Sequence, residues 1–386
     1  MNIVRVAMIS SVYHPCYHAP GMCRFVTELS KYLVNLGINL DVITINWHKF
    51  SEREKFNGVN IYRVPAPRLP SIFPIIFQGI NARHLLKKEK YDVIHVQGGE
   101  GWFVIPLRKK KKFVMVTTAL GTAKGEMKAI KSVGLKNFLF KYVHWNILHA
   151  FDKHTMRHSD RIVAISNKTK SEVVRQMGVS GSQIDVIYPG VDGKKFRSQP
   201  NSHNKNSDCL HLLYIGPLIQ RKGLKYLIQA LPLCDIKTHL TIIGRGIEEA
   251  SLRSLAGRLG VEREITWITN RISEEDLIWH YNNADVFVLP TLYEGFGIPL
   301  IESMACSTPV ISTNIPPINE IVVNDKTGIL LPLQNTNEIA RAITKLSDSD
   351  LRCRMGNKAR KHIEKNFSWE ISAKKLLGIY EEMVGV

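Results

Sequence analysis

The sequence predicts an α/β protein of two domains, each built on a parallel sheet. Short apolar runs of strand length alternate with helical patterns along most of the chain, as they do in βαβ units. A polar stretch at residues 197–208 contains no apolar residue and divides this alternation into two sets. With 386 residues and 44% hydrophobic content, the chain can bury two substantial cores. We therefore expect domains at 1–195 and 196–368, followed by a final helix at 369–386.

The first half contains six strand-like runs. A helix is expected after the first run, because Val26, Leu29, Leu33 and Leu36 recur at helical spacing and Gly37 ends the pattern. The runs lie at residues 4–10, 40–45, 93–96, 113–117, 161–165 and 185–188.

The second half repeats the pattern with five further runs separated by helices. Two Rossmann-like halves are thus expected to face each other, and a ligand should lie between the carboxyl ends of their sheets. The runs lie at residues 211–215, 240–243, 265–267, 286–289 and 310–312.

Cysteine usage and hydropathy indicate a cytoplasmic protein. The six cysteines form no CxxC pair and show no zinc-like spacing, which favours free thiols in a reducing compartment. The apolar run at residues 3–9 is too short for the core of a signal peptide and is better interpreted as a buried strand. No apolar run approaches the roughly 20 residues that span a bilayer.

The net charge of +18 is concentrated in residues 108–175. This segment holds sixteen Lys and Arg against four Asp and Glu, a net +12. Such a field attracts anionic partners such as phospholipid headgroups or lipid-linked phosphates. Within it, lysines alternate with aromatic and leucine residues, as an interfacial helix requires, although a core-facing helix with a basic outer face fits equally well. An anionic membrane surface is therefore one expected partner, reached from the cytoplasmic side.

The strongest local signal is the segment from Glu294 to Glu302. It follows a strand and contains a glycine-rich turn that opens a helix, with Pro299 suited to the first helical position. Gly295 and Gly297 allow the backbone to approach a ligand, and the first N–H groups of a helix bind anions. This pattern suits a nucleotide-sugar, with backbone amides for phosphate, one glutamate for sugar hydroxyls and the other for ribose hydroxyls. A strand, turn and helix with two solvated glutamates is the alternative.

Two further loops offer sites for an anion. The loop from Gly216 to Gly223 follows the first strand of the second half and carries Arg221 and Lys222, cations that can meet a diphosphate. The loop after the very first strand contains prolines and Gly21 and ends at a helix N-terminus, which is another anion cradle.

These motifs resemble those of the retaining glycosyltransferases of family 4, which share a two-domain architecture called GT-B. The family's E-x7-E signature matches Glu294 and Glu302, and its Lys-Gly pair matches Lys222 and Gly223. The resemblance covers nearly the whole chain and implies that the last helix crosses back to the N-terminal domain. Several positions depart from the family, and three of them concern the expected site: Met22 replaces the second glycine of a Gly-Gly pair, Pro217 replaces an arginine, and Ala119 stands near a usual histidine.

The resemblance also implies a reaction and a donor site. A hexose would move from a UDP- or GDP-sugar to a lipid-linked or glycan acceptor, with retention at the anomeric carbon and without a metal or other cofactor. Glu294 and Lys222 would be the catalytic residues, orienting the sugar and stabilising the departing nucleotide. The donor-binding residues would be Gly21, Gly216, Arg221, Lys222, Glu294, Gly295, Phe296, Gly297, Ile298 and Glu302.

Three other functions fit parts of the sequence. A sugar-nucleotide epimerase has a similar fold and needs no acceptor. A nucleic-acid-binding protein would explain the pI of 9.6, but the chain lacks zinc spacing, an aromatic RNA-binding strand and a helix-turn-helix boundary. A catalytically silent, membrane-associated subunit would explain the departures at Met22, Ala119 and Pro217.

Overall fold

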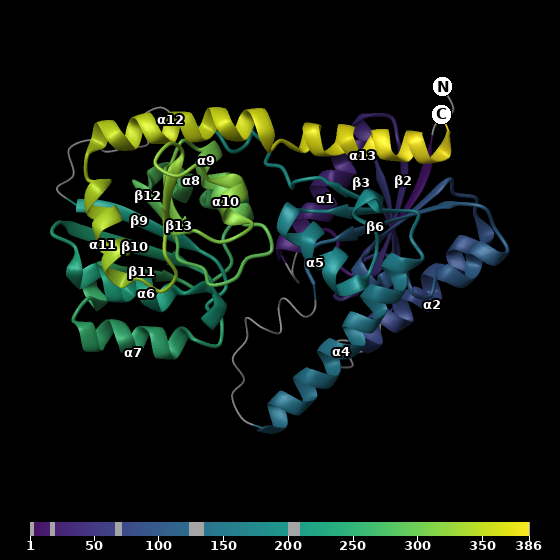
Figure 1. Ribbon diagram of the computed structural model, residues 1–386, viewed down its shortest axis with the longest axis horizontal. Coiled ribbons are helices and arrows are strands. Elements are labelled where there is room, and N and C mark those ends of the chain that lie inside the picture. Colours follow the sequence, from purple (N-terminus) through teal and green to yellow (C-terminus); the bar gives the residue numbers. More distant parts are fainter. Residues whose placement is uncertain (1–3, 16–19, 66–71, 123–134, 200–208, 386) are drawn as a thin grey trace. The chain divides into compact units, whose positions relative to one another are not determined.

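A computed structural model describes residues 4–15, 20–65, 72–122, 135–199 and 209–385, and its ribbon is drawn in Figure 1. The chain divides into two compact units. Unit 1 holds the chain up to Gly190 together with the last helix from Trp369, and unit 2 holds Val191–Ser368. The sequence analysis placed this division at residues 195 and 196, and most of its polar linker, residues 200–208, lies outside the described residues.

Unit 1 is built on an eight-stranded sheet in the order β3-β4-β2-β1-β5-β6-β7-β8. All neighbouring strands pair in parallel except β3 with β4. The strands are β1 (Arg5–Ile9), β2 (Asn39–Ile45), β3 (Arg53–Phe56), β4 (Val59–Val64), β5 (Val93–Gln97), β6 (Val114–Ala119), β7 (Arg161–Ala164) and β8 (Ile184–Val186).

Helices cover both faces of this sheet. On one face, α2 (Ile72–Lys88) packs against a core that includes Ile9, Ile43 and Val96. On the other, α1 (Pro20–Asn35) meets α13 (Trp369–Val384) through the rings of Phe25 and Trp369, 5.9 Å apart. The remaining helices among the described residues of unit 1 are α4 (Leu135–Arg157) and α5 (Asn167–Met177), with short 3-10 turns η1 (Gly98–Gly101), η2 (Ile105–Lys109) and η3 (Gly181–Gln183).

Unit 2 is built on a six-stranded parallel sheet in the order β11-β10-β9-β12-β13-β14. Figure 1 shows α6, α7 and α11 along one side of this sheet and α8, α9 and α12 along the other. The strands are β9 (Cys209–Ile215), β10 (Lys237–Ile243), β11 (Ile265–Ile268), β12 (Val286–Leu289), β13 (Val310–Thr313) and β14 (Gly328–Leu331). The helices are α6 (Leu224–Ala230), α7 (Glu249–Leu259), α8 (Glu274–Asn283), α9 (Ile298–Ala305), α10 (Ile318–Ile321), α11 (Thr336–Lys345) and α12 (Ser349–Asn366), with 3-10 turns η4 (Gln220–Lys222), η5 (Leu231–Leu233) and η6 (Glu262–Glu264).

The predicted fold class is confirmed: unit 2 is built on a parallel sheet and unit 1 on a sheet that is parallel except for β3, each with helices on both faces. The sequence analysis did not anticipate three strands, the hairpin β3–β4 and the edge strand β14. The expectation of free thiols holds for Cys209, Cys234, Cys306 and Cys353 but is wrong for Cys23, which is disulfide-bonded.

None of the helices among the described residues has the length and hydropathy needed to cross a bilayer.

Candidate active site

In unit 2, the loops after β9 and β12 leave the sheet in opposite directions. The two strands are neighbours, but the chain continues from β9 to β10 on one side and from β12 to β13 on the other. In open parallel sheets, ligands bind at the carboxyl ends of the strands where the strand order reverses in this way. Lys222 follows β9 and Glu294 follows β12, so the topology itself brings these two residues to the same point.

Lys222 and Glu294 form a buried ion pair across these loops. The Lys222 ammonium donates a hydrogen bond to Oε2 of Glu294, and both residues are less than a tenth exposed. The other carboxylate oxygen, Oε1, accepts the backbone N–H of Gly295 at 3.1 Å. Both oxygens are thereby held in a fixed orientation.

This environment keeps Glu294 ionised. Burial alone would raise the pKa of its carboxyl group. The charge and hydrogen bond of Lys222, the charge of Arg221 and the N–H of Gly295 outweigh burial, and the pKa lies below its ordinary value. The site therefore contains a carboxylate and an ammonium group together in a region of low exposure.

Backbone contacts fix the spacing of the two loops. The carbonyl oxygen of Arg221 accepts the N–H of Leu292 at 2.7 Å and the hydroxyl of Thr291 at 3.0 Å. In return, Nη1 of Arg221 donates to the carbonyl of Tyr293 at 3.3 Å. Arg221 thus holds the loop that carries Glu294, in addition to contributing positive charge.

Helix α9 begins at Ile298, four residues after Glu294, and Gly295, Phe296 and Gly297 lie between them. Gly297 precedes the helix with a φ of 111°, a left-handed conformation that a residue with a side chain rarely adopts. Ile298 and Pro299 then open the first turn. Pro299 has no N–H and Leu300 donates its own to the carbonyl of Gly297 at 2.9 Å, so the N–H without a partner within the helix is that of Ile298. The start of α9 is therefore an anion-binding terminus next to Glu294 in the chain.

Glu302 lies further along α9 and has a different environment. Its side chain is buried, with 3% of the residue exposed, and it accepts the hydroxyl of Tyr281 at 2.8 Å. Burial raises the pKa of the neighbouring Cys306 thiol to about 12, and the charge of Glu302 adds to this effect. The predicted contact of Glu302 with ribose hydroxyls stays a prediction.

The two other predicted glycines lie just after β9 and in the first turn of α1. Gly216 follows β9 and donates its N–H to the carbonyl of Ile243 at 3.0 Å. Gly21 belongs to unit 1, in the first turn of α1, and a Cβ atom placed on it would meet no heavy atom within 4 Å. Packing within unit 1 therefore does not explain a glycine at this position.

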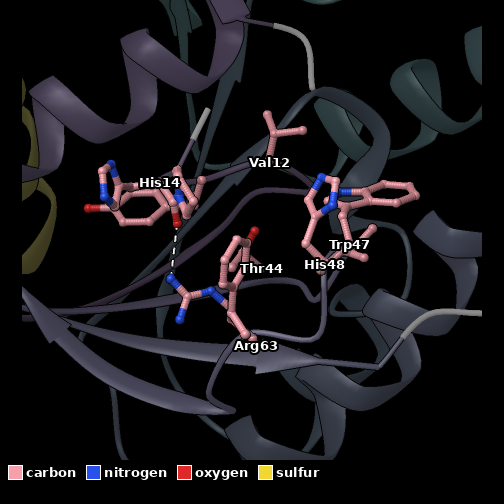
Figure 2. Close-up of a pocket in the computed structure, with 10 residues that line it drawn as sticks. Val12, His14, Thr44, Trp47, His48 and Arg63 are labelled. Carbon is pink, nitrogen blue, oxygen red and sulfur yellow. Dashed lines mark hydrogen bonds between the residues drawn. The ribbon is translucent and has the colours of Figure 1, made fainter. Parts of the chain in front are cut away.

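Unit 1 contains a small cavity behind the loop after β1, shown in Figure 2. Its volume of about 10 Å³ is room for about one water molecule. Arg63 donates to the carbonyl of His14 at 3.0 Å (Figure 2). The His14 ring stacks on Phe56, with the ring centroids 3.9 Å apart. These contacts give His14 a structural role. His18 lies outside the described residues. The other lining residues are Val12, Tyr13, Pro15, Thr44, Ile45, Trp47, His48 and Phe50.

Sequence reasoning missed Glu100, a buried carboxyl group at the switch point of unit 1. It lies in η1 after β5, and both of its oxygens are 3.0 Å from the backbone N of Ser11, which follows the neighbouring strand β1. Burial, assisted by the charge of Asp152, raises the pKa of Glu100 to about 8, although the Ser11 bonds oppose the rise. No local sequence pattern marks a contact between residues 89 positions apart.

Two further positions at the sheet of unit 1 have core environments. His95 is fully buried between the hydroxyls of Tyr380 and Thr118, at 2.5 and 2.6 Å, so its role is structural. Ala119 lies in a hydrophobic cluster with Met156 and Ile162. A longer polar side chain at residue 119 would therefore point into a core.

Among the described residues, no three His, Cys, Asp or Glu side chains gather in a way that could hold a metal ion.

Family models match the two halves of the chain in succession. The model described as Glycosyltransferase Family 4 matches residues 20–195, and that described as Glycosyl transferases group 1 matches residues 195–362. Matched by these two models in succession, the chain is a family 4-like glycosyltransferase. The second model spans the whole Lys222–Glu294 site, so the buried ion pair lies within the segment that matches the group 1 glycosyl transferases.

Individual proteins of known sequence or structure are similar to this chain over nearly its full length. An uncharacterised glycosyltransferase of Methanocaldococcus jannaschii is 28% identical, covering 99% of this chain and all of the relative. The sucrose-phosphate synthase of Thermosynechococcus elongatus has the same fold, with a TM-score of 0.85, 22% identity and 99% of each chain covered. Anabaena HepE, solved in complex with UDP and glucose, has a TM-score of 0.76 and 14% identity, covering 98% of this chain and all of that one.

Proposed function

We propose that this glycosyltransferase moves a hexose from a UDP- or GDP-sugar to a lipid-linked or glycan acceptor, with retention at the anomeric carbon and without a bound metal ion. The observation that carries the proposal is the buried Lys222–Glu294 pair at the carboxyl ends of β9 and β12. The site contains a fixed cation that can bind phosphate and a fixed carboxylate that can bind hydroxyl groups. The loop that carries the carboxylate also leads to the N-terminus of α9.

Lys222 is suited to stabilise the leaving diphosphate. An ammonium group has three N–H donors, so Lys222 can keep its bond to Glu294 and still donate to a phosphate oxygen. Negative charge grows on the diphosphate as the glycosidic bond breaks, so the attraction is stronger in the transition state than in the bound donor. The N–H of Ile298 at the start of α9 would act in the same direction. Together these donors could replace a metal ion in neutralising the leaving group.

Glu294 is suited to orient the hexose. Each carboxylate oxygen can accept more than one hydrogen bond, so Oε1 and Oε2 can take sugar hydroxyls in addition to the bonds from Gly295 and Lys222. Because its pKa is lowered, Glu294 remains an acceptor at neutral pH. Its pairing with Lys222 makes it a weak nucleophile, which agrees with a mechanism in which the leaving phosphate takes the acceptor's proton on the same face.

The choice of acceptor is proposed from charge. The net +12 of residues 108–175 favours an acceptor presented at an anionic surface, such as a lipid-linked glycan at the inner face of the cell membrane. Of this segment, residues 123–134 lie outside the described residues. For the donor, the UDP and glucose bound by Anabaena HepE make UDP-hexoses the first candidates to test.

The test is calorimetric binding of UDP-, GDP- and ADP-sugars, followed by turnover with the donor that binds. Lys222→Ala should lower turnover by about a hundredfold or more, as removal of a transition-state donor does. Lys225→Ala, three residues along on α6, is the matched control and should retain turnover. Glu302→Ala should lose donor binding if this residue contacts the ribose. Near-normal turnover in Lys222→Ala would overturn the proposed site.

The stereochemistry and the metal requirement have separate tests. The anomeric coupling constant of the product, measured by NMR, should match that of the donor, and turnover should survive a chelator. Failure of every donor to bind would favour the catalytically silent subunit, because such a protein needs no nucleotide-sugar.

A further inference from the structure

Helix α2 carries a single line of exposed side chains along its outer face. Phe73, Phe77 and Ile80 are 45%, 43% and 52% exposed, and their spacing of four and three residues places them on one side of the helix. The same line continues through His84 and Lys87, with Lys88 beside it, and all three are exposed. The outer face is therefore apolar in its first half and cationic in its second.

This cluster is unusual for the surface of unit 1. Among the described residues of unit 1, seven large apolar side chains are exposed, and five of them lie on α2 and α4. The two on α4 are Val143 and Ile147, 54% and 39% exposed. Exposed apolar side chains that gather in this way mark an interaction surface rather than ordinary scatter.

The two helices are joined through Phe103. Its ring lies against Gly79 of α2 and makes an edge-to-face contact with Phe151 of α4, with the centroids 6.3 Å apart. Ile80 is next to Gly79 in α2, and Ile147 is one turn before Phe151 in α4. The exposed apolar residues of the two helices thus flank one packed junction.

Positive charge collects at the other end of α2. Nζ of Lys111 donates to the carbonyl oxygens of Leu86, Lys87 and Glu89 at 2.7–2.9 Å, so Lys111 caps the C-terminal end of α2. This contact brings the basic run at residues 108–112 to the same end as Lys87 and Lys88. The sequence analysis treated the run as part of a basic segment without a link to α2.

We propose that the outer face of α2 docks on an anionic lipid bilayer, with Phe73, Phe77 and Ile80 inserted and with the exposed lysines of both segments on the headgroups, namely Lys87, Lys88, Lys109, Lys110 and Lys112. The helix rises about 1.5 Å per residue, so Phe73 and Lys87 are roughly 20 Å apart along it. A helix that is apolar at one end and cationic at the other docks at a tilt, with its N-terminal end deeper. Interfacial helices typically bury about 5–10 Å of their apolar part, which matches the reach of these side chains.

Charge complementarity selects this occupant. A neutral protein partner would cover the apolar half but leave the cationic half unmatched, whereas an anionic bilayer satisfies both along one helix. The inference deepens the membrane-presented acceptor of the proposed function and rests on it for its biological purpose. The surface itself is defined by residues separate from the Lys222–Glu294 site.

The experiment is co-sedimentation of the full-length protein with phosphatidylcholine vesicles, with and without phosphatidylglycerol. Wild type should bind the anionic vesicles and bind them less as salt rises. Phe73→Ser with Phe77→Ser should weaken binding roughly tenfold or more, because two half-exposed aromatic rings lose their insertion. Lys87→Glu with Lys88→Glu should remove most of the preference for anionic lipid.

Val174→Ser is the matched control, since Val174 is an exposed apolar residue of unit 1 on α5, away from this face. It should bind vesicles like wild type. The inference would be overturned if the Phe73→Ser, Phe77→Ser variant bound vesicles as well as wild type does. It would also be overturned if wild type formed a dimer without lipid and this variant did not. Donor binding by the serine variant tests the proposed transferase function separately. If the variant binds donor but not vesicles, both the transferase function and the docking surface are supported. If the chain binds vesicles through α2 but binds no donor, only the docking surface is supported.

Discussion

Gly223 lies so close to Pro290 that a Cβ atom on the glycine would stand 2.0 Å from the Pro290 carbonyl oxygen. The two residues belong to the loops after β9 and β12, which carry Lys222 and Glu294. The φ of Gly223 is also +67°, a conformation that disfavours any side chain. The close approach of these loops is therefore a condition for the ion pair, and it explains why glycine follows the lysine.

Gly223→Ala should lower the free energy of unfolding of unit 2 by about 2–4 kcal/mol, because the backbone must move and the residue is strained. The same movement should displace Lys222 and lower turnover. Gly21→Ala is the control for stability, since its Cβ would meet no atom within 4 Å. Urea unfolding of both variants makes the comparison, and equal stability of Gly223→Ala and wild type would show that the loops are not tightly packed.

The buried ion pair should behave differently when one partner is removed and when both are. Lys222→Met leaves the buried Glu294 carboxylate without its cation, which should cost about 3–5 kcal/mol in the free energy of unfolding. Lys222→Met with Glu294→Gln removes both charges and should cost less than the single change. Lys345→Met is the control, because its pair with Asp325 is more than half exposed and should contribute about 1 kcal/mol or less. Additive losses in the double variant would contradict the coupling.

Much of unit 1 and unit 2 could be predicted because most of the parallel strands contain a short run of buried apolar residues, as β1 and β12 do. The hairpin β3–β4 was missed because β3 reads Arg-Glu-Lys-Phe, a charged edge strand without apolar alternation. Its turn was nevertheless visible: Asn57 and Gly58 both have positive φ and form the dipeptide that favours two-residue hairpins. Attention to that dipeptide would have found the strand pair.

The candidate site was only partly predictable. Glu294 and its glycine-rich turn are local, so the sequence pattern identified them. The partnership with Lys222 depends on β9 and β12 being neighbours, which the order of strands along the chain does not state. Glu100 was missed for the same reason, since its contact with Ser11 exists only because β1 and β5 are adjacent in the sheet.

Glu100 should make unit 1 less stable as the pH rises. Its pKa is raised from 4.5 to about 8 in the folded chain, so between these values the folded state keeps a proton that the unfolded state has lost. The free energy of unfolding then falls with increasing pH, by up to about 1.4 kcal/mol per pH unit. Glu100→Gln cannot titrate and should remove this fall. Hydrogen exchange of the β1 and β5 amides measures it within unit 1, and an unchanged slope in the variant would contradict a shifted Glu100.

His95 should change the free energy of unfolding of unit 1 with pH in the direction opposite to Glu100, over a pH range that overlaps that of Glu100. Burial lowers its pKa from 6.5 to about 3, so between these values the unfolded state binds a proton that the folded state does not. The free energy of unfolding of unit 1 therefore falls as the pH decreases below about 6.5. Between about pH 4.5 and 6.5 the contributions of His95 and Glu100 oppose each other, and wild type should show a shallow pH dependence there.

Each single variant should expose the contribution of the other residue. His95→Gln should leave the Glu100 effect alone, so that the stability of unit 1 falls steadily as the pH rises from about 4.5 to 8. Glu100→Gln should leave the His95 effect alone, so that stability rises from about pH 3 to 6.5 and then levels off. Hydrogen exchange at the β5 amides, which adjoin both residues, follows the two variants with one probe. Parallel pH profiles for the two variants would contradict the opposition, because it requires slopes of opposite sign.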